Sequence, residues 1–258
     1  MFSNSDQSST SENQNPGRVL IKIGDCIKPL LIRREMSDVE FVVGRDYDAE
    51  QLFPAHRLIM SVRSAVFQTM FYGSMPEKCT APIDIPDIHP EAFANVLCYM
   101  YTDTVTNFTQ ENVFDTLTCA DKYDLPLLVT MCTDFVLDTV NVNNCLDILD
   151  NAVRCAGIAP KILEHCLGLV DESPIAIWES EQFCAIGHEA LRIILQRDTL
   201  TANEYCICWA ANQWDFNMCK QRNMDTSSAN RREILGQMLF LLRFPLLTDA
   251  QLLSGPTK

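Results

Sequence analysis

Basic residues are scarce in this sequence. Its 258 residues include 20 Lys and Arg against 34 Asp and Glu, and the formal net charge is -14. Proteins that bind nucleic acid neutralise phosphates with Lys and Arg, and attraction to anionic membranes needs the same side chains. We therefore expect no nucleic acid and no membrane among the partners, whereas a basic protein partner is compatible with this charge.

Long apolar segments are missing as well. The first sixteen residues are mostly Ser, Asn, Gln and Asp, without the basic start and apolar centre of a secretory signal. Further along, no apolar run is long enough to span a bilayer. The composition predicts a disordered tail at 1–16. We expect the protein in the cytoplasm, and access to the nucleus is compatible with the sequence.

Motifs of catalytic sites are also absent. The sequence has no glycine-rich dinucleotide or phosphate loop, no nucleophile elbow and no zinc-protease helix motif. It has 4 histidines, of which His165 stands next to Cys166. Adjacent helical residues point about 100° apart, so these two cannot form a catalytic pair. We expect a protein that is not an enzyme and uses no cofactor.

Cysteine is plentiful, with 12 residues, but no C-x-x-C pair occurs. Most of the cysteines lie among aliphatic residues in helical patterns, which predicts reduced, buried thiols. A metal site is the alternative, and Cys206, Cys208 and Cys219 are its strongest candidates. Cysteines two apart on a helix point to different sides, so we expect no metal site there.

The hydrophobic pattern up to residue 140 predicts a small sheet with several helices. Apolar runs at 39–44 and 51–53 predict a β-hairpin, and the run 83–85 predicts a third strand. Apolar residues recur at helical spacing between Ile23 and Leu31. Helices are therefore expected at 23–31 despite Pro29, from Pro54, at 63–72, from His89, and at 110–122 and 125–140.

From residue 141 onward only helical periodicity is visible. A capping box at 201–204 predicts the start of a helix that runs through Trp214, and a last helix is expected from Ile234 to Leu242. The fold class is thus α+β and mostly helical, with an all-α second part. The expected domains follow the tail at 1–16 and cover 17–140 and 141–245, with a C-terminal tail at 246–258.

Several fragments carry a family resemblance. Ser37-Asp38-Val39 leading into Phe41-Val42-Val43, and then Pro54-Ala55-His56-Arg57-Leu58-Ile59, resembles the core signature of BTB/POZ domains. The BTB likeness covers about residues 20–140, and residues 141–245 resemble the BACK region, with Phe183-Cys184-Ala185-Ile186 as one similar pattern. The combination looks most like the BTBD subfamily of cullin-3 adaptors. Those relatives usually continue into a β-sandwich (PHR) domain, which we do not expect in this chain.

The resemblance implies a homodimer formed through the first helix and a swapped edge strand, although the candidate for that strand, Arg18 to Ile21, is short. It also implies a partly buried charged spot at Asp38 and Arg57, for which an internal pair within one chain is the alternative. His56 is expected to bond the backbone at a domain contact. The implied interface residues are Ile27, Leu30, Leu31, Asp38, His56 and Arg57.

The resemblance further implies docking on the N-terminal domain of cullin-3. Such adaptors use an apolar–x–Glu motif after the third BTB helix, and Met75 and Glu77 match it here. A solvated loop without cullin binding is the alternative. We therefore expect a dimeric substrate adaptor for a cullin-3 RING E3 ubiquitin ligase, with an unknown substrate protein. A BTB scaffold or transcriptional co-regulator without a ligase is the second reading.

Overall fold

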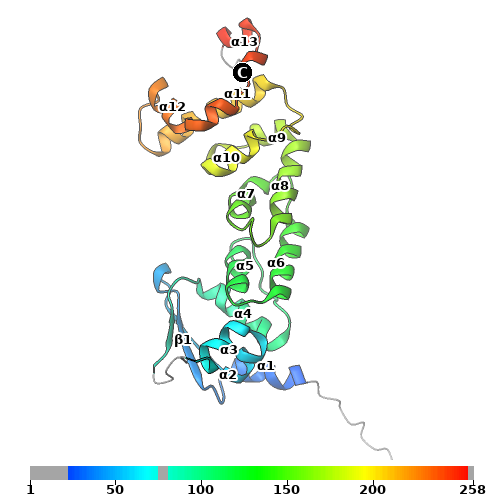
Figure 1. Ribbon diagram of the computed structural model, residues 1–258, viewed down its shortest axis with the longest axis vertical. Coiled ribbons are helices and arrows are strands. Elements are labelled where there is room, and N and C mark those ends of the chain that lie inside the picture. Colours follow the sequence, from blue (N-terminus) through cyan, green and yellow to red (C-terminus); the bar gives the residue numbers. More distant parts are fainter. Residues whose placement is uncertain (1–22, 75–80, 255–258) are drawn as a thin grey trace, which may run out of the picture.

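The protein is elongated in the computed structural model, which describes residues 23–74 and 81–254 (Figure 1). A small sheet and the first helices form one end of the molecule. The later helices are stacked away from this end and reach α11, α12 and α13 at the other. The expected fold class, a mostly helical α+β fold with an all-helical continuation, is confirmed.

The first part of the chain contains all three strands found in the described residues. Their order in the sheet is β2-β1-β3, with β1 antiparallel to β2 and parallel to β3. The elements are α1 (Ile23–Arg33), β1 (Val39–Val43), η1 (Arg45–Tyr47), β2 (Gln51–Ala55), α2 (Arg57–Arg63), α3 (Ala65–Tyr72), β3 (Ile83–Ile85), α4 (Pro90–Thr102), α5 (Val113–Lys122) and α6 (Pro126–Thr139).

The return strand is longer than the sequence pattern predicts. A helix was expected from Pro54, but β2 continues to Ala55 and α2 begins only at Arg57. Pro54 is tolerated there because β2 lies at the edge of the sheet, where a missing N–H need not break a ladder bond. This shift places His56 at the junction between strand and helix.

The second part of the chain is entirely helical within the described residues. It consists of α7 (Cys145–Arg154), α8 (Pro160–Glu172), α9 (Pro174–Trp178), η2 (Gln182–Ala185), α10 (His188–Leu195), α11 (Glu204–Gln221), α12 (Ser228–Leu235), η3 (Gly236–Leu241), η4 (Phe244–Leu246) and α13 (Asp249–Ser254).

Three details of this second part differ from the sequence pattern. The N-cap of α11 is Asn203, whose side chain accepts from the Cys206 N–H, while the Thr201 hydroxyl donates to the Asp171 carbonyl. The last helix is split at Gly236, where φ is +49°. The segment predicted as a tail from residue 246 contains α13, which Thr248 and Gln251 begin with a reciprocal capping box.

An aromatic cluster fills the core beneath the sheet. The rings of Phe67 and Tyr123 stack with their centroids 4.3 Å apart, and Phe93 lies 5.3 Å from both Phe41 and Phe53. Phe41, Phe67 and Phe93 are fully buried. These rings fasten β1, α3 and α4 to the end of α5.

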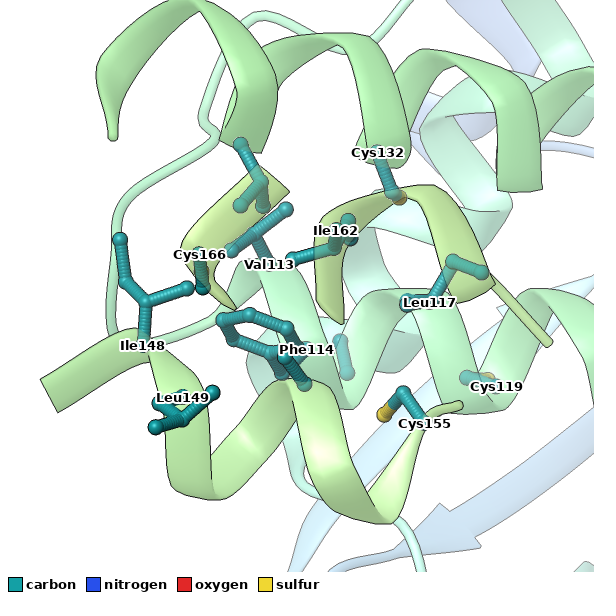
Figure 2. Packing of buried hydrophobic residues seen from close by; sticks show 14 of the residues in the cluster. Val113, Phe114, Leu117, Cys119, Cys132, Ile148, Leu149, Cys155, Ile162 and Cys166 are labelled. Atoms are coloured by element: carbon teal, nitrogen blue, oxygen red, sulfur yellow. The ribbon is translucent and has the colours of Figure 1, made fainter. Parts of the chain in front are cut away.

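The core continues without a break into the second part of the chain. Figure 2 shows Phe114 and Leu117 of α5 beside Leu149 of α7 and Ile162 of α8. Leu117, Leu149 and Ile162 are fully buried. The boundary expected at 141–143 is therefore a bend in the chain and does not separate two cores.

Candidate interaction surfaces

His56 ties the end of α1 to the core of the first part. Its Nε2 lies 2.7 Å from the Glu35 carbonyl oxygen, and its Nδ1 lies 2.7 Å from the Tyr101 hydroxyl. A carbonyl only accepts, so Nε2 carries the proton and Nδ1 accepts from Tyr101. Burial raises the pKa of Tyr101 to about 12, which keeps this hydroxyl protonated. The expected backbone contact of His56 is present.

Asp38 and Arg57 meet, but through the backbone of Arg57. The Asp38 carboxylate accepts from the Arg57 N–H at 2.8 Å, at the first turn of α2. A carboxylate in this place satisfies a free N–H and complements the helix dipole. The Arg57 guanidinium instead lies 5.2 Å from the Phe71 ring centroid. Asp38 and Arg57 thus interact within one chain, as the alternative interpretation expected. The contact is a helix cap, and their side chains form no ion pair.

The guanidinium of Arg57 has unmet hydrogen-bonding capacity. Its Nε and Nη2 are buried and have no acceptor among the described residues. Beside it lies a cleft of about 370 Å³, lined also by Ser37, Asp38 and Glu40. A buried donor without a partner is costly, and the Phe71 ring offsets only part of that cost.

Exposed apolar side chains gather on α1 and α2 and on the turn between α1 and β1. Leu58 and Val62 are one helical turn apart on α2, and 69% and 76% of their surface is exposed. Ile32 and Met36 are similarly exposed at the end of α1, which His56 and Asp38 hold close to the start of α2. We call these four residues the α1–α2 face.

Three of the residues expected at the dimer interface are less exposed than the α1–α2 face. Ile27, Leu30 and Leu31 are half-buried and pack against the core. The apolar stripe of α1 thus contacts its own domain, because apolar periodicity reports burial whatever covers the helix, and its place in a dimer interface stays a prediction. The i, i+4 spacing of Leu58 and Val62 was available in the sequence and was overlooked.

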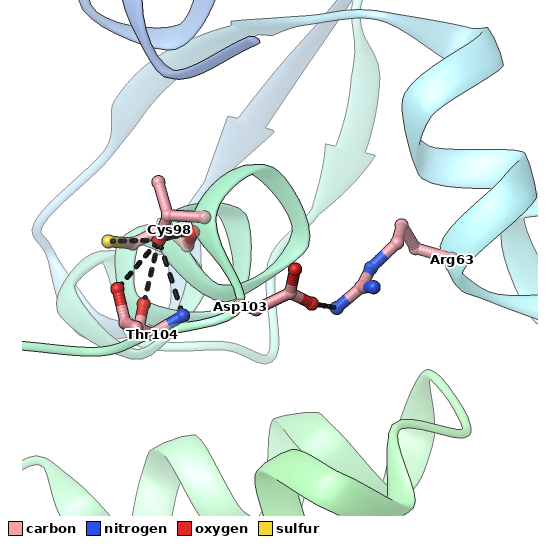
Figure 3. Close-up of polar contacts among 5 residues, drawn as sticks. Arg63, Cys98, Asp103 and Thr104 are labelled. Carbon is pink, nitrogen blue, oxygen red and sulfur yellow. Dashed lines mark hydrogen bonds and ion pairs between the residues drawn. The ribbon is translucent and has the colours of Figure 1, made fainter. Parts of the chain in front are cut away.

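An ion pair anchors the far end of α2. Figure 3 shows Arg63, in the last turn of α2, reaching Asp103, and the two side chains are 2.5 Å apart. Asp103 ends α4 with a φ of +59°, and the Arg63 guanidinium lies 4.9 Å from the Tyr99 ring centroid. This contact joins the last turn of α2 to the end of α4.

A second cleft lies where the two parts of the chain join. This junction cleft has a volume of about 320 Å³ and is lined by residues of η1, α5 and α7, among them Tyr47, Lys122 and Arg154. Lys122 donates to both carboxylate oxygens of Asp87, and this hydrogen bond lowers the pKa of Asp87. Arg154 is exposed and donates to Asn151, and no carboxylate pairs with it among the described residues.

Comparisons with known proteins match both parts of the chain. A BTB/POZ domain model matches residues 28–139, and a BACK model (BTB And C-terminal Kelch) matches residues 145–255. The chain belongs to the BTB-BACK proteins. The two matches meet around the bend in the chain, so the sheet and α1–α6 form the BTB domain and the following helices form the BACK region.

Curated relatives carry the same kind of name. The chain is 34% identical to BTB/POZ domain-containing protein 6-B of Danio rerio over 85% of this chain and 45% of the relative. It is 32% identical to BTB/POZ domain-containing protein 6 of Homo sapiens over 89% and 43%, respectively. For BTB/POZ domain-containing protein 3 of Homo sapiens the values are 34%, 85% and 41%. The chain spans less than half the length of these relatives.

Membership of these families indicates a protein-interaction adaptor. BTB and BACK families are generally non-enzymatic, and the matches indicate no catalytic family. In the described part of the chain, no group of three or more His, Cys, Asp or Glu side chains could hold a metal ion. No helix described by the structure is long and apolar enough to cross a membrane.

The BTB-BACK cysteines are mostly core residues. Cys119, Cys132 and Cys166 are buried, and burial raises the pKa of each thiol, to about 12 for Cys132 and Cys166. Figure 2 shows these three side chains among apolar neighbours in α5, α6 and α8. Thiols with such a pKa are poor nucleophiles at neutral pH, as expected of small hydrophobic core residues.

Two of the sequence predictions cannot be located. The cullin motif, with Met75 and Glu77, and the tail at 1–16 lie outside the described residues. In the chain the motif lies between Ser74, two residues after α3, and Ala81, two residues before β3.

Proposed function

We propose that this chain is a dimeric substrate adaptor for a cullin-3 RING E3 ubiquitin ligase. One observation carries the proposal: BTB and BACK domains share a continuous core, and an apolar–x–Glu motif stands between α3 and β3. An adaptor must hold its ligase and its substrate at a fixed separation. The unbroken core from α5 into α7 and α8 supplies that rigidity.

The α1–α2 face supports the dimer part of the proposal. Ile32, Met36, Leu58 and Val62 put four large apolar side chains into solvent on neighbouring elements. Exposed apolar side chains on neighbouring elements mark an interaction site more often than single scattered ones do. In a homodimer, two copies of this face would bury each other. An acceptor from the second copy could then take the hydrogen bonds that Arg57 Nε and Nη2 do not make within the described part of their own chain.

A double substitution tests the dimer. Leu58→Asp with Val62→Asp places charges on exposed positions and should give a monomer, because two carboxylates would be desolvated in each half of the interface. Light scattering coupled to size-exclusion chromatography measures the mass. Leu127→Asp, at another exposed leucine on α6, is the matched control and should leave the dimer intact. A double variant that stays dimeric would remove the α1–α2 face from the proposal.

Cullin docking is proposed at Met75 and Glu77. Met offers a flexible apolar side chain that adapts to a partner groove, and a neighbouring Glu adds a charged acceptor. The junction cleft lies between the BTB domain and the first BACK helix and offers an unpaired cation, Arg154, to the same partner.

Affinity for the isolated cullin-3 N-terminal domain tests this docking. Met75→Ala with Glu77→Ala should weaken binding at least tenfold, measured by isothermal titration calorimetry, since an apolar anchor and a charged contact are both removed. Glu172→Ala removes the same charge from the exposed end of α8 and should bind like the unaltered protein. An unaltered protein without measurable affinity, but still dimeric, would favour the scaffold or co-regulator reading.

The compartment follows from the same proposal. An adaptor for a cullin ligase would work in the cytoplasm, and nuclear access would suit the co-regulator reading. Imaging of the tagged full chain in cells distinguishes the two distributions.

A further inference from the structure

The BACK region carries a second apolar groove, far from the BTB domain. Its walls include Leu235 at the end of α12, Leu239 and Leu242 on and after η3, and Phe244 at the start of η4, and its volume is about 270 Å³. Arg231 and Arg232 of α12 line its polar side. We call it the distal groove; it lies toward the α11–α12 end of the molecule in Figure 1.

Backbone geometry holds the groove open. At Gly236 the chain has a φ of +49°, so α12 ends and the backbone turns into η3. Leu235 and Leu242 are buried at the base, whereas Phe244 keeps 38% of its surface exposed at the rim. Nearby along the chain, Phe240 and Leu246 are 75% and 67% exposed. Phe244 is therefore the large aromatic side chain that the groove itself leaves partly in solvent, and Phe240 and Leu246 are exposed close to it in the chain.

The two arginines have different surroundings. Arg231 is engaged internally, because its Nε donates to the buried Asp215 carboxylate at 2.6 Å and its Nη2 donates to the Asn212 carbonyl at 3.0 Å. Burial outweighs this contact and raises the pKa of Asp215. Arg232 is exposed, and no carboxylate is paired with it among the described residues. Arg232 is thus the cation available to a partner.

The charged residues of the groove leave one cation free in the part of the chain that the structure describes. Asp215 and Arg231 both line the groove and pair with each other, and Arg243, beside Phe244 in the chain, pairs with Asp198. Arg232 is the remaining charged residue of the lining, and it has no ion pair among the described residues. An exposed cation at the edge of an apolar groove favours an acidic partner segment over a basic one.

We propose that the distal groove binds an acidic amphipathic segment of a recruited protein, with Leu- or Phe-like side chains in the groove and Asp or Glu at Arg232. The inference rests on the proposed function and deepens it, since it gives the adaptor a substrate-recruiting surface within the BACK region. Apolar anchors would supply most of the affinity, and the charge contact at the rim would supply selectivity.

A random 16-residue peptide display library, selected on the full chain, is the probe. Enriched peptides should pair apolar residues with Asp or Glu, and their affinity is then measured by fluorescence anisotropy. Arg232→Glu and Phe244→Ala should each weaken the binding of an enriched peptide about tenfold, and added salt should weaken it further. Lys161→Glu, an equal charge reversal on the exposed side of α8, should bind like the unaltered chain.

Several outcomes would overturn this inference. One is a library that yields no enriched peptide, and another is an enriched peptide that binds the Arg232→Glu and Phe244→Ala variants with unchanged affinity. A lower oligomeric mass of these variants would identify a second copy of the chain as the occupant instead. Both substituted positions are at least partly exposed, and unchanged thermal unfolding shows that the variants fold.

Cullin-3 binding separates this inference from the proposed function. Arg232→Glu and Phe244→Ala should keep the cullin affinity of the unaltered chain. Loss of peptide binding with cullin binding retained assigns the effect to the groove. Peptide binding by a chain that has no cullin affinity would keep the groove and reject the ligase role.

Discussion

Tyr101 binds two groups of His56 with one hydroxyl. It accepts from the His56 N–H at 3.0 Å and donates to Nδ1 of the same residue, whose Nε2 then holds the Glu35 carbonyl. All of these contacts are buried or half-buried. One side chain of α4 therefore fixes both the start of α2 and the end of α1.

Removing this hydroxyl should destabilise the protein. Tyr101→Phe leaves the His56 N–H and Nδ1 without a partner, and we expect a loss of about 1–3 kcal/mol in the free energy of unfolding. Urea titration followed by circular dichroism measures it. Tyr72→Phe, at a tyrosine that is 61% exposed, is the control and should change the stability little. Equal stability of both variants would contradict the assigned network.

Asp171 makes the BACK region sensitive to acid. Arg197 donates to it through Nε at 2.9 Å and Thr199 donates at 2.7 Å, and the Arg197 hydrogen bond lowers the pKa of Asp171. A lowered folded-state pKa means that the unfolded chain binds more protons in this range, so stability rises with pH. The contribution is complete above about pH 4 and is lost as the pH falls below it.

Asp171→Asn should therefore have a pH-dependent cost. We expect a loss of about 2 kcal/mol at pH 7, because the charged hydrogen bonds disappear, and a much smaller loss near pH 3. Asp198→Asn, in an ion pair whose carboxylate side chain is 85% exposed, should cost little at either pH. A cost that does not change between the two pH values would refute this assignment.

At the scale of elements, two glycines with a positive φ stand at element boundaries, and their surroundings differ. Gly44 has a φ of +92°, and a Cβ there would lie 2.6 Å from Pro90 Cγ and 2.9 Å from the Ala49 carbonyl oxygen. Gly236 has a φ of +49°, and a Cβ would meet nothing within 4 Å. The first turn is thus packed against the start of α4, and the second faces open space.

The two alanine variants should separate strain from contact. Gly236→Ala is expected to cost about 1–2 kcal/mol, which is the backbone penalty for a positive φ. Gly44→Ala should cost clearly more, because the same penalty is joined by an overlap with Pro90. Thermal unfolding of the two variants, measured side by side, tests the order. Equal costs would mean that the Pro90 contact relaxes freely.

At the scale of the molecule, the column of helices predicts unequal stability along its length. Many contacts join elements that are close in the chain, such as α5 with α6, α7 with α8 and α11 with α12. Such stacks transmit stability through neighbouring interfaces, so a defect at one end weakens that end first. Figure 1 shows the BTB sheet and α11 at opposite ends.

Trp214 is the place to introduce such a defect. Its ring is fully buried in α11, and its Nε1 donates to the Ile186 carbonyl at 2.8 Å. Trp214→Ala should speed amide hydrogen exchange in α10, α11 and α12 and leave β1, α3 and α4 protected, as mass spectrometry would measure. Cys119→Ala, a smaller truncation in α5, is expected to act near the junction instead. Uniformly faster exchange with Trp214→Ala would indicate a single cooperative unit.

The amino-acid sequence alone determined the fold class and the family. Strand alternation at 39–43, the helix-start prolines and the apolar stripes of α4 and α7 are local patterns, and they match the structure because local and tertiary preferences agree there. The sequence fragments around Asp38 and Arg57 indicated the BTB/POZ family, and the family model matches the segment that contains them. The burial of Cys119, Cys132 and Cys166 also agrees with their apolar neighbours in the sequence, whereas Cys26 is exposed.

Only the tertiary structure decided which apolar residues stay in solvent. Apolar periodicity predicted that Leu30 and Leu31 are covered by other apolar side chains. Whether those side chains belong to the same domain or to a second copy depends on how distant parts of the chain pack. The two roles of Arg57 also depend on how α2 lies against Asp38. Its backbone N–H donates to the Asp38 carboxylate, while its guanidinium Nε and Nη2 have no acceptor among the described residues. The distal groove lies where the chain turns at Gly236 from α12 into η3, and its lining comes from residues between Cys208 and Phe244 that only the fold brings together.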